Sequence, residues 1–459
     1  MKRLIFKVLM IPVMLLTFTA CPQDPDFGTE SHAKKYLKDE YMDVYYYWND
    51  EINKKANPNL PIEEYFNALL YAKDRWSWMM DNSGLVTMQT GVVTGSFGMS
   101  VAQSVEYYGD YDILVRYVIK DGPADKAGIE RGWVITHLGG VETMTLIREG
   151  KINDELSKSP QNYTFRLPDG SSKEITLSAT TLNEPSYLDV QIFTPEDFDG
   201  LNENVGYFNY LSFTASKLNE IRTAMATLKS HNVKKMILDL RYNGGGDGEA
   251  SQLLVNYLAP KSADGEIYAI RSHNKILKLA GWNESLKIER DENALDLDQL
   301  YIITGEGSAS ASEVVLNGLK PLMNIQHVGD TTYGKPNGMY ILIYPGEKEY
   351  YDEFNLGKYD NIQWCFLPIS FYTTNKDGYG NYEDGLIPDH YRPDNLYEPF
   401  GAEEDLIKAC LTHITTGKYP QLPAKKSRVK SISNIDGNIA IEKRDPNWGE
   451  YRVVPPTVK

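Results

Sequence analysis

The chain has 459 residues, a length that allows two to three domains. Hydrophobic residues make up 42% and charged residues 24%, which supports a packed core and excludes a mostly disordered chain. The net charge of −16 argues against a nucleic-acid-binding surface, which needs a basic patch. The three cysteines (Cys21, Cys365 and Cys410) are too few for a disulfide framework, and no CxxC spacing suggests a metal site.

The first twenty residues are typical of a secretory signal. Three basic residues within the first seven precede an apolar run over 8–18, which is shorter than the roughly 20 residues of a membrane-spanning helix. The string Phe18-Thr19-Ala20-Cys21 resembles a bacterial lipobox, although Leu is usual where Phe18 stands. We expect lipid modification at Cys21 and a tether over 21–35. The alternative is an ordinary cleaved signal followed by an incidental cysteine.

A helical region is predicted over 36–87. Apolar residues recur there at steps of three and four, and a second helix is expected to start near Ile62. The first stripe consists of Leu37, Tyr41, Val44, Tyr45 and Trp48. Helical spacing favours core packing over a ligand-binding platform for these aromatic residues.

Residues 88–182 read as a small β-rich unit. The segment from Asp121 to Ile135 opens with a turn, continues as a short helix that ends at Gly128, and leads into an apolar strand. It resembles the SPAxxAGLxxGDxI signature of PDZ domains, with Trp133 in place of the usual Asp, a change that could alter packing on the rest of the protein. The resemblance implies that Phe97, Gly98 and Met99 form a loop whose N–H groups bind a peptide carboxylate.

Strands and helices alternate from residue 183 to residue 423, which predicts an α/β core. Short apolar strands are expected at 236–240 and 300–304, and a helix is expected after the second of them. Residues 424–459 are polar and are predicted to be an irregular extension.

Three segments of this core carry candidate chemistry. They are Leu238–Gly245, Gly307–Glu313 and Val328–Lys335. A strand end followed by small residues and a helix start suits a nucleophile, although Ser312 and its neighbours could merely cap the helix. In this order, after a PDZ-like unit, the three segments resemble the LDLRxNxGG, GSASASE and VGxxTxGK motifs of the carboxyl-terminal processing peptidases, also called tail-specific proteases. Gly206-Tyr207-Phe208 and Gly385–Asp389 fit two further elements of that family.

The resemblance implies a Ser–Lys dyad with Ser310 as nucleophile and Lys335 as general base, Ser308 and Ser312 being structural. A lysine amine titrates near 10.4 in water, and burial can lower that pKa until a neutral amine accepts the serine proton. Backbone N–H groups of Ala311 and Gly245 are the expected oxyanion donors. No cofactor or metal is implied.

Two features leave alternatives open. Many family members have a glutamine four residues after the lysine, where this chain has Met339, and Asn337 is near enough in sequence to substitute. His327 could pair with a serine instead of Lys335, but its apolar, strand-like flanks favour a structural histidine.

The sequence is therefore interpreted as an α/β multidomain protein: a helical N-terminal region, a PDZ domain and a crotonase-like (ClpP/crotonase) peptidase core. The expected function is that of a lipid-anchored serine endopeptidase of the bacterial cell envelope, in the outer membrane, acting on proteins with free C-termini. The alternative is a catalytically inactive peptide- or ligand-binding lipoprotein, or a PDZ adaptor, on the same fold.

Overall fold

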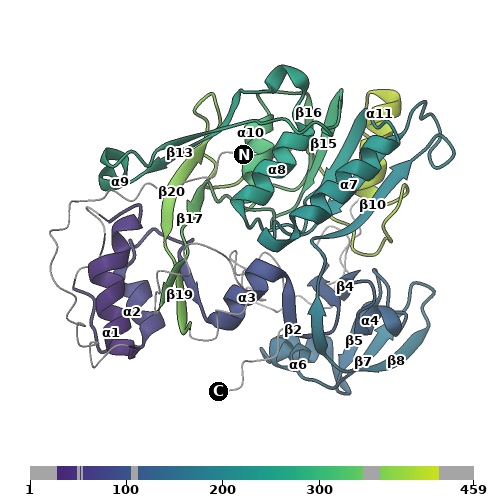
Figure 1. Cartoon of the computed structure of the whole chain (residues 1–459). Coiled ribbons are helices and arrows are strands. Elements are labelled where there is room, and N and C mark those ends of the chain that lie inside the picture. The colour runs from purple at the N-terminus through teal and green to yellow at the C-terminus, as the bar shows by residue number, and fades with distance from the viewer. Residues whose placement is uncertain (1–27, 49–51, 53–54, 105–111, 345–361, 423–459) are drawn as a thin grey trace.

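The computed structural model describes residues 28–48, 52, 55–104, 112–344 and 362–422. Figure 1 shows a central α/β core, a helical N-terminal region on one side of it and a β-rich unit on the other. Cys21, residues 22–27 of the expected tether and the expected extension over 424–459 lie outside the described residues. The prediction of a tether up to residue 35 is wrong at its end, because a helix begins at Glu30. Within the described ranges, no helix has the length and apolar character needed to cross a membrane.

The N-terminal region is only partly helical. Helix α1 spans Glu30–Tyr36 and continues as a π-helix over Leu37–Tyr41 and a 3-10 turn over Met42–Val44. Helix α2 spans Ile62–Leu69 and begins at the predicted residue. The region also contains a strand, β1 (Trp78–Met80), so the expectation of an all-helical segment is wrong there. Backbone pairing of β1 with β19 (Trp364–Leu367) provides the partner that sequence periodicity does not reveal.

Both predicted boundaries of the β-rich unit fall inside regular elements. Helix α3 (Asn82–Thr90) crosses residue 87, and strand β9 (Thr180–Asn183) crosses residue 182 while pairing with β2 (Val92–Ser96). A second sheet has the order β3-β4-β5-β7-β8, with β6 beside β5. These strands are β3 (Met99–Gln103), β4 (Ile113–Val118), β5 (Val134–Leu138), β6 (Val141–Glu142), β7 (Gln161–Arg166) and β8 (Ser172–Leu177). The short helices are α4 (Pro123–Lys126), α5 (Thr143–Arg148) and α6 (Ile152–Leu156).

Trp133 packs inside this unit. Its ring lies edge-on to Phe165 at 5.5 Å, within the apolar cluster of the unit itself. The suggestion that Trp133 alters packing on the core is therefore wrong, because its side chain points into the unit.

The central sheet has the order β10-β11-β12-β15-β16-β21, and all neighbours are parallel except the β10–β11 pair. Its strands are β10 (Tyr187–Phe193), β11 (Val205–Tyr210), β12 (Lys235–Asp239), β15 (Gln299–Thr304), β16 (Ile325–Gly329) and β21 (His390–Tyr391). Strands β12 and β15 confirm the strands predicted at 236–240 and 300–304. Both are buried throughout most of their length, as apolar parallel strands covered on two faces should be.

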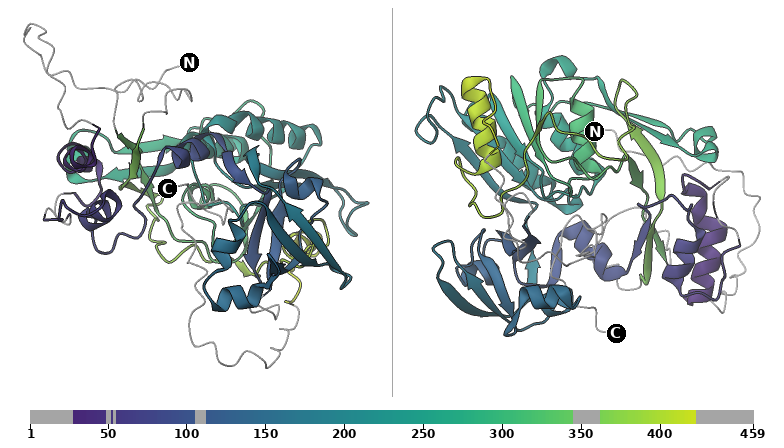
Figure 2. Two further views of the ribbon diagram at one scale, coloured as in Figure 1. Left: turned by 90° about the horizontal axis from the view of Figure 1, so that it is seen from below. Right: turned by 180° about the vertical axis from the view of Figure 1, so that it is seen from behind.

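Helices cover both faces of this sheet (Figure 2). Helices α7 (Leu218–Ser230), α8 (Gly248–Leu258) and α10 (Ala311–Leu319) share one apolar cluster, and α11 (Asp405–Thr416) closes the opposite face. The helix predicted after the second strand is α10.

A separate four-stranded sheet links the core to the N-terminal region. Its order is β14-β13-β20-β17, with the short helix α9 (Lys275–Leu279) following β13. The strands are β13 (Ile267–His273), β14 (Glu284–Lys287), β17 (Asn337–Met339) and β20 (Ile369–Thr374), and β18 (Leu342–Tyr344) joins β19 beside β1. The N-terminal helices pack on residues of β17, β18, β19 and β20, so this region contacts the segment that follows Lys335.

Candidate active site

Ser310 stands at a sharp turn between strand β15 and helix α10. Its backbone φ is +53°, a left-handed conformation that a non-glycine residue adopts only when its surroundings hold it there. Two flanking serines provide that hold: the Ser308 hydroxyl donates to Leu240 O at 2.7 Å, and the Ser312 hydroxyl donates to Asn243 O at 2.9 Å. Both hydroxyls are buried and engaged, whereas Ser310 is half-buried at the surface of the turn. This arrangement resembles a nucleophile elbow.

The glycine loop after β12 lies against this turn. A Cβ atom at Gly245 would come within 2.9 Å of the Ser310 Cβ and 3.0 Å of the Ala311 nitrogen, so only glycine fits, and its φ of +104° also favours glycine. Ala311 is the first residue of α10, where the N–H has no acceptor within the helix. The Gly245 N–H donates to Asn243 Oδ1 at 2.8 Å. Gly245 therefore lies against Ser310 and Ala311, but its N–H already donates to the side chain of Asn243, so its role as an oxyanion donor stays a prediction.

Glu313 joins the turn that carries Ser310 to the loop that carries Lys335. Its Oε2 atom accepts hydrogen bonds from the backbone N–H groups of Ser310 and Lys335, each at 2.8 Å. Its Oε1 atom accepts from Gly334 N at 2.8 Å and from the Thr332 hydroxyl at 2.5 Å. Burial raises the pKa of Glu313, and these four donors oppose that rise. One carboxylate thus brings Ser310 and Lys335 into the same small volume.

Lys335 is buried, and its Nζ atom lies 3.7 Å from Met339 Sδ. A thioether is a weak acceptor, so the residue at the position where glutamine is usual does contact the amine but binds it weakly. Asn337 is also buried, and neither polar atom of its side chain has a hydrogen-bond partner. The suggestion that Asn337 replaces the glutamine thus has no hydrogen bond to Lys335 in its favour.

His327 belongs to the sheet. Its Nε2 atom lies 2.7 Å from the Thr304 hydroxyl on the neighbouring strand, and the ring is buried. Burial lowers the pKa of His327 to about 4, which keeps the imidazole neutral at pH 7. These contacts favour the structural interpretation.

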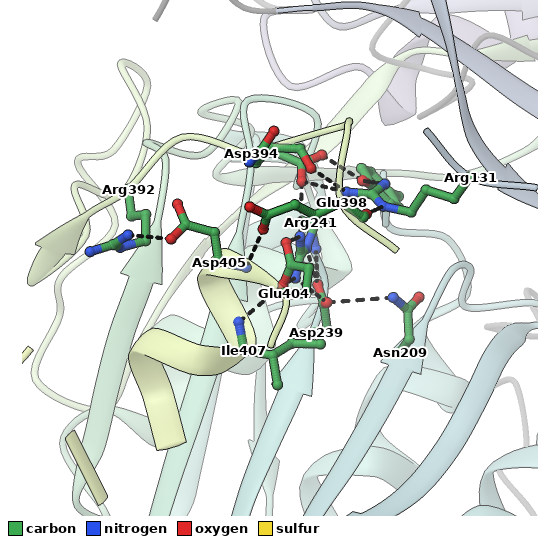
Figure 3. Close-up of polar contacts among 12 residues, drawn as sticks. Arg131, Asn209, Asp239, Arg241, Arg392, Asp394, Glu398, Glu404, Asp405 and Ile407 are labelled. Carbon is green, nitrogen blue, oxygen red and sulfur yellow. Dashed lines mark hydrogen bonds and ion pairs between the residues drawn. The ribbon is translucent and has the colours of Figure 1, made fainter. Parts of the chain in front are cut away.

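An ionic network connects the β-rich unit to the strand that leads into the glycine loop (Figure 3). Arg131 donates to Asp394 Oδ1 at 2.9 Å and to the Tyr242 hydroxyl at 2.6 Å. Arg241 pairs with the same Asp394 oxygen at 2.9 Å, with Glu404 at 2.7 Å and with Asp239 at 2.8 Å. Tyr242 directly precedes Asn243, so the β-rich unit reaches the loop beside Ser310 through the buried Arg131 and the partly buried Asp394.

In the loop of the β-rich unit that was predicted to bind a carboxylate, the N–H of Gly98 already has an acceptor. Gly98 has φ +69°, as a tight turn requires, but its N–H donates to the Ser96 hydroxyl at 3.0 Å. Phe97 and Met99 are buried in the apolar cluster of the unit. Strand β3, which begins at Met99, is nevertheless an edge strand of its sheet, the position at which an extended peptide can pair.

The sequence motifs contain Glu313 and Arg131 but do not indicate a role for either residue. No motif includes Arg75 or Trp76, whose side chains donate hydrogen bonds to the carbonyl oxygen of Gly334, next to Lys335. A glutamate three positions after a serine is the sequence pattern of a capping box, and this local signal could have pointed to Glu313 as the partner of the turn. Arg131, Arg75 and Trp76 act across hundreds of residues, where spacing carries no signal.

Two family models match this chain. Residues 204–348 match the model described as Peptidase family S41, and residues 39–78 match the model described as Peptidase S41 N-terminal domain. The first segment contains Gly245, Ser310, Ala311 and Lys335.

Several known proteins are similar. A probable CtpA-like serine protease of Staphylococcus haemolyticus is 24% identical over 79% of this chain and 65% of its own length. The carboxy-terminal processing protease CtpA of Bacillus subtilis is 26% identical over 52% of this chain and 49% of its own. The chain thus spans about half to two thirds of the length of these relatives. The crystal structure of a putative S41 protease from Bacteroides fragilis has the same fold, with a TM-score of 0.64 and 20% identity over 83% of this chain and 97% of the other.

Proposed function

Because this chain belongs to peptidase family S41, we propose that it is a serine endopeptidase of the carboxyl-terminal processing type, with Ser310 as nucleophile and Lys335 as general base. The observation that carries the proposal is the carboxylate of Glu313, which holds the backbones of both residues at 2.8 Å. The curated relatives extend well beyond the matched region, so the activity of the whole protein is part of the proposal.

The reaction proceeds by transfer of an acyl group to Ser310. The buried amine of Lys335 takes the proton of the serine hydroxyl as the oxygen attacks the peptide carbonyl carbon. The proposed donor to the developing oxyanion is the N–H of Ala311, the first residue of α10. The C–N bond then breaks and the leaving amine takes the proton from Lys335. A water molecule, deprotonated by the same amine, hydrolyses the acyl-serine ester.

Incubation with a denatured protein, followed by mapping of the cut sites, tests this assignment. Ser310→Ala and Lys335→Ala should each lower kcat by at least ~10³-fold while the circular dichroism spectrum stays unchanged. Lys335→Arg should also lower kcat by at least ~10³-fold, because a guanidinium stays protonated and cannot accept the proton of the serine hydroxyl. Lys320→Ala, which removes an exposed lysine, is the control. Substantial turnover by a folded Lys335→Ala variant would contradict the Ser–Lys assignment and bring His327 forward.

Recognition of substrate C-termini is a second part of the proposal. It is supported by the PDZ-like signature and by the edge position of β3, and it requires Gly98 to exchange its bond to Ser96 for a peptide carboxylate. Matched peptides with free and amidated C-termini should then differ in KM, and equal kcat/KM for the pair would remove tail recognition.

Anchoring through Cys21 in the outer membrane of a bacterial envelope completes the proposal and rests on the N-terminal sequence.

One observation favours the rival, a binding protein that has lost catalysis: the weak acceptor Met339 stands beside the Lys335 amine. A fluorophosphonate probe discriminates between the two. Labelling of the wild type at Ser310, absent from Ser310→Ala, excludes a non-catalytic protein.

A further inference from the structure

Two side chains of the N-terminal region bind the backbone next to the proposed general base. Trp76 donates through Nε1 to the carbonyl oxygen of Gly334 at 3.1 Å, and Arg75 donates through Nη2 to the same oxygen at 3.2 Å. Trp76 and Gly334 are 258 positions apart in the sequence. The contact of Trp76 is fully buried, so no water competes for it.

The peptide group between Gly334 and Lys335 is held at both ends. Its oxygen accepts from Trp76 and Arg75, and its N–H, that of Lys335, donates to Glu313 at 2.8 Å. Gly334 has φ +88°, and a Cβ there would lie 2.1 Å from the Glu383 carbonyl oxygen, so the loop cannot shift toward that side. The orientation of this peptide plane sets the direction in which the Lys335 side chain leaves the backbone.

The turn that carries the two donors is itself rigid. Asp74 accepts from the backbone N–H groups of Trp76 and Ser77, at 2.9 and 3.0 Å, and from the Tyr45 hydroxyl at 2.7 Å. The Trp76 ring packs edge-on to Tyr372 at 6.4 Å. The guanidinium of Arg75 lies over the rings of Trp76 and Tyr333, at 5.0 and 5.2 Å. Because these contacts hold the side chains of Trp76 and Arg75 in place, their hydrogen bonds also hold the carbonyl oxygen of Gly334 in place.

We propose that Trp76, assisted by Arg75, is a positioning residue for Lys335, so that the N-terminal region completes the active site. The inference rests on the proposed function. Its physical basis is the steep dependence of proton transfer on geometry, because displacement of a catalytic group by about 1 Å can lower a rate about a hundredfold.

Trp76→Phe is the decisive variant, since it removes the N–H donor and keeps an aromatic ring against Tyr372. We expect kcat to fall about ten- to hundredfold with KM within about twofold of wild type, because ground-state binding of the substrate is unchanged. The rate of fluorophosphonate labelling at Ser310 should fall in parallel. The acid limb of the kcat profile should move to higher pH, since a displaced amine gains water and favours its charged form.

Trp133→Phe is the matched control, because Trp133 is equally buried but packs on Phe165 inside the β-rich unit. This variant measures how much the unfolding temperature falls when a buried indole that does not contact Gly334 is lost. Arg75→Met serves if Trp76→Phe does not fold, because Arg75 is exposed and the variant keeps its apolar stem while removing the donor. A severalfold lower kcat is expected for Arg75→Met.

The outcomes separate this inference from the proposed function. A wild type that neither cleaves protein nor labels at Ser310 overturns both. An active wild type together with Trp76→Phe and Arg75→Met variants that retain its kcat, labelling rate and pH profile overturns the positioning role alone. Equal losses in Trp76→Phe and Trp133→Phe, without a shift of the acid limb, would also overturn it.

Discussion

The two regions that flank the core each contact one half of the candidate site, and they do so by different physics. The β-rich unit reaches the glycine loop through an ionic network in which the buried Arg131 binds the partly buried Asp394 and the hydroxyl of Tyr242. The N-terminal region reaches the lysine loop through the indole N–H of Trp76, with one guanidinium beside it. A buried ionic network depends on every member being present, whereas a hydrogen bond from an indole depends mainly on geometry. Substitutions in the two regions should therefore differ in size, in pH dependence and in the kinetic constant that they change.

The largest effect is expected from Arg131→Ala, which breaks the contact of the β-rich unit. Removing the cation leaves Asp394 with Arg241 as its remaining ionic partner and the Tyr242 hydroxyl without its donor. We expect the free energy of unfolding to fall by about 3–5 kcal/mol, as for other broken buried pairs. Urea denaturation measures it. Arg148→Ala, an exposed arginine of the same unit, should change stability by less than about 0.5 kcal/mol. Equal effects of the two substitutions would show that the network contributes nothing.

Acid should weaken the ionic contact between Arg131 and Asp394 but leave the hydrogen bond from Trp76 to Gly334 unchanged. Burial alone would raise the pKa of Asp394 above 3.8, but Arg131 and Arg241 lower it to about 2. Because the folded pKa lies below the ordinary value, the stabilisation is complete above about pH 4 and is lost as the pH falls toward 2.

The unfolding free energy of the wild type should thus decline more steeply between about pH 4 and pH 2 than that of Asp394→Asn. Trp76→Phe removes no titrating group, so its curve should run parallel to that of the wild type. Parallel curves for the wild type and Asp394→Asn would refute the assignment of the acid-sensitive contact to Asp394.

The smallest effect is expected on the lysine side, from Met339→Gln. In the wild type the Lys335 amine contacts the sulfur of Met339 at 3.7 Å, whereas the carboxamide oxygen of a glutamine can accept a hydrogen bond from it. Because this stronger acceptor should orient the amine better, kcat should rise about two- to tenfold. Met339→Leu keeps the size without an acceptor and should give no gain. If Met339→Gln lowers kcat as much as Met339→Leu does, the amine needs no acceptor at this position.

Local patterns predicted the parts of the site that depend on short stretches of chain. Strands β12 and β15, the turn that carries Ser310 and the start of α10 all lie where the sequence indicated. Each follows from an apolar run that ends in small residues, which is a property of neighbouring positions. The expected helix over 37–48 was only partly correct: it changes to π and 3-10 turns after Tyr36 and ends at Val44.

By itself, the sequence determined the fold class, the order of the three parts and the resemblance to a peptidase family, because periodicity, turn residues and motif order are encoded along the chain. Tertiary structure alone decided that Gly245 turns its N–H toward Asn243, that Glu313 joins the loops of Ser310 and Lys335 and that strand β1 joins the core. It also decided that Arg131 and Trp76 reach the two halves of the site. Those contacts form between segments far apart in sequence, where packing and hydrogen-bond satisfaction select partners that no local pattern specifies.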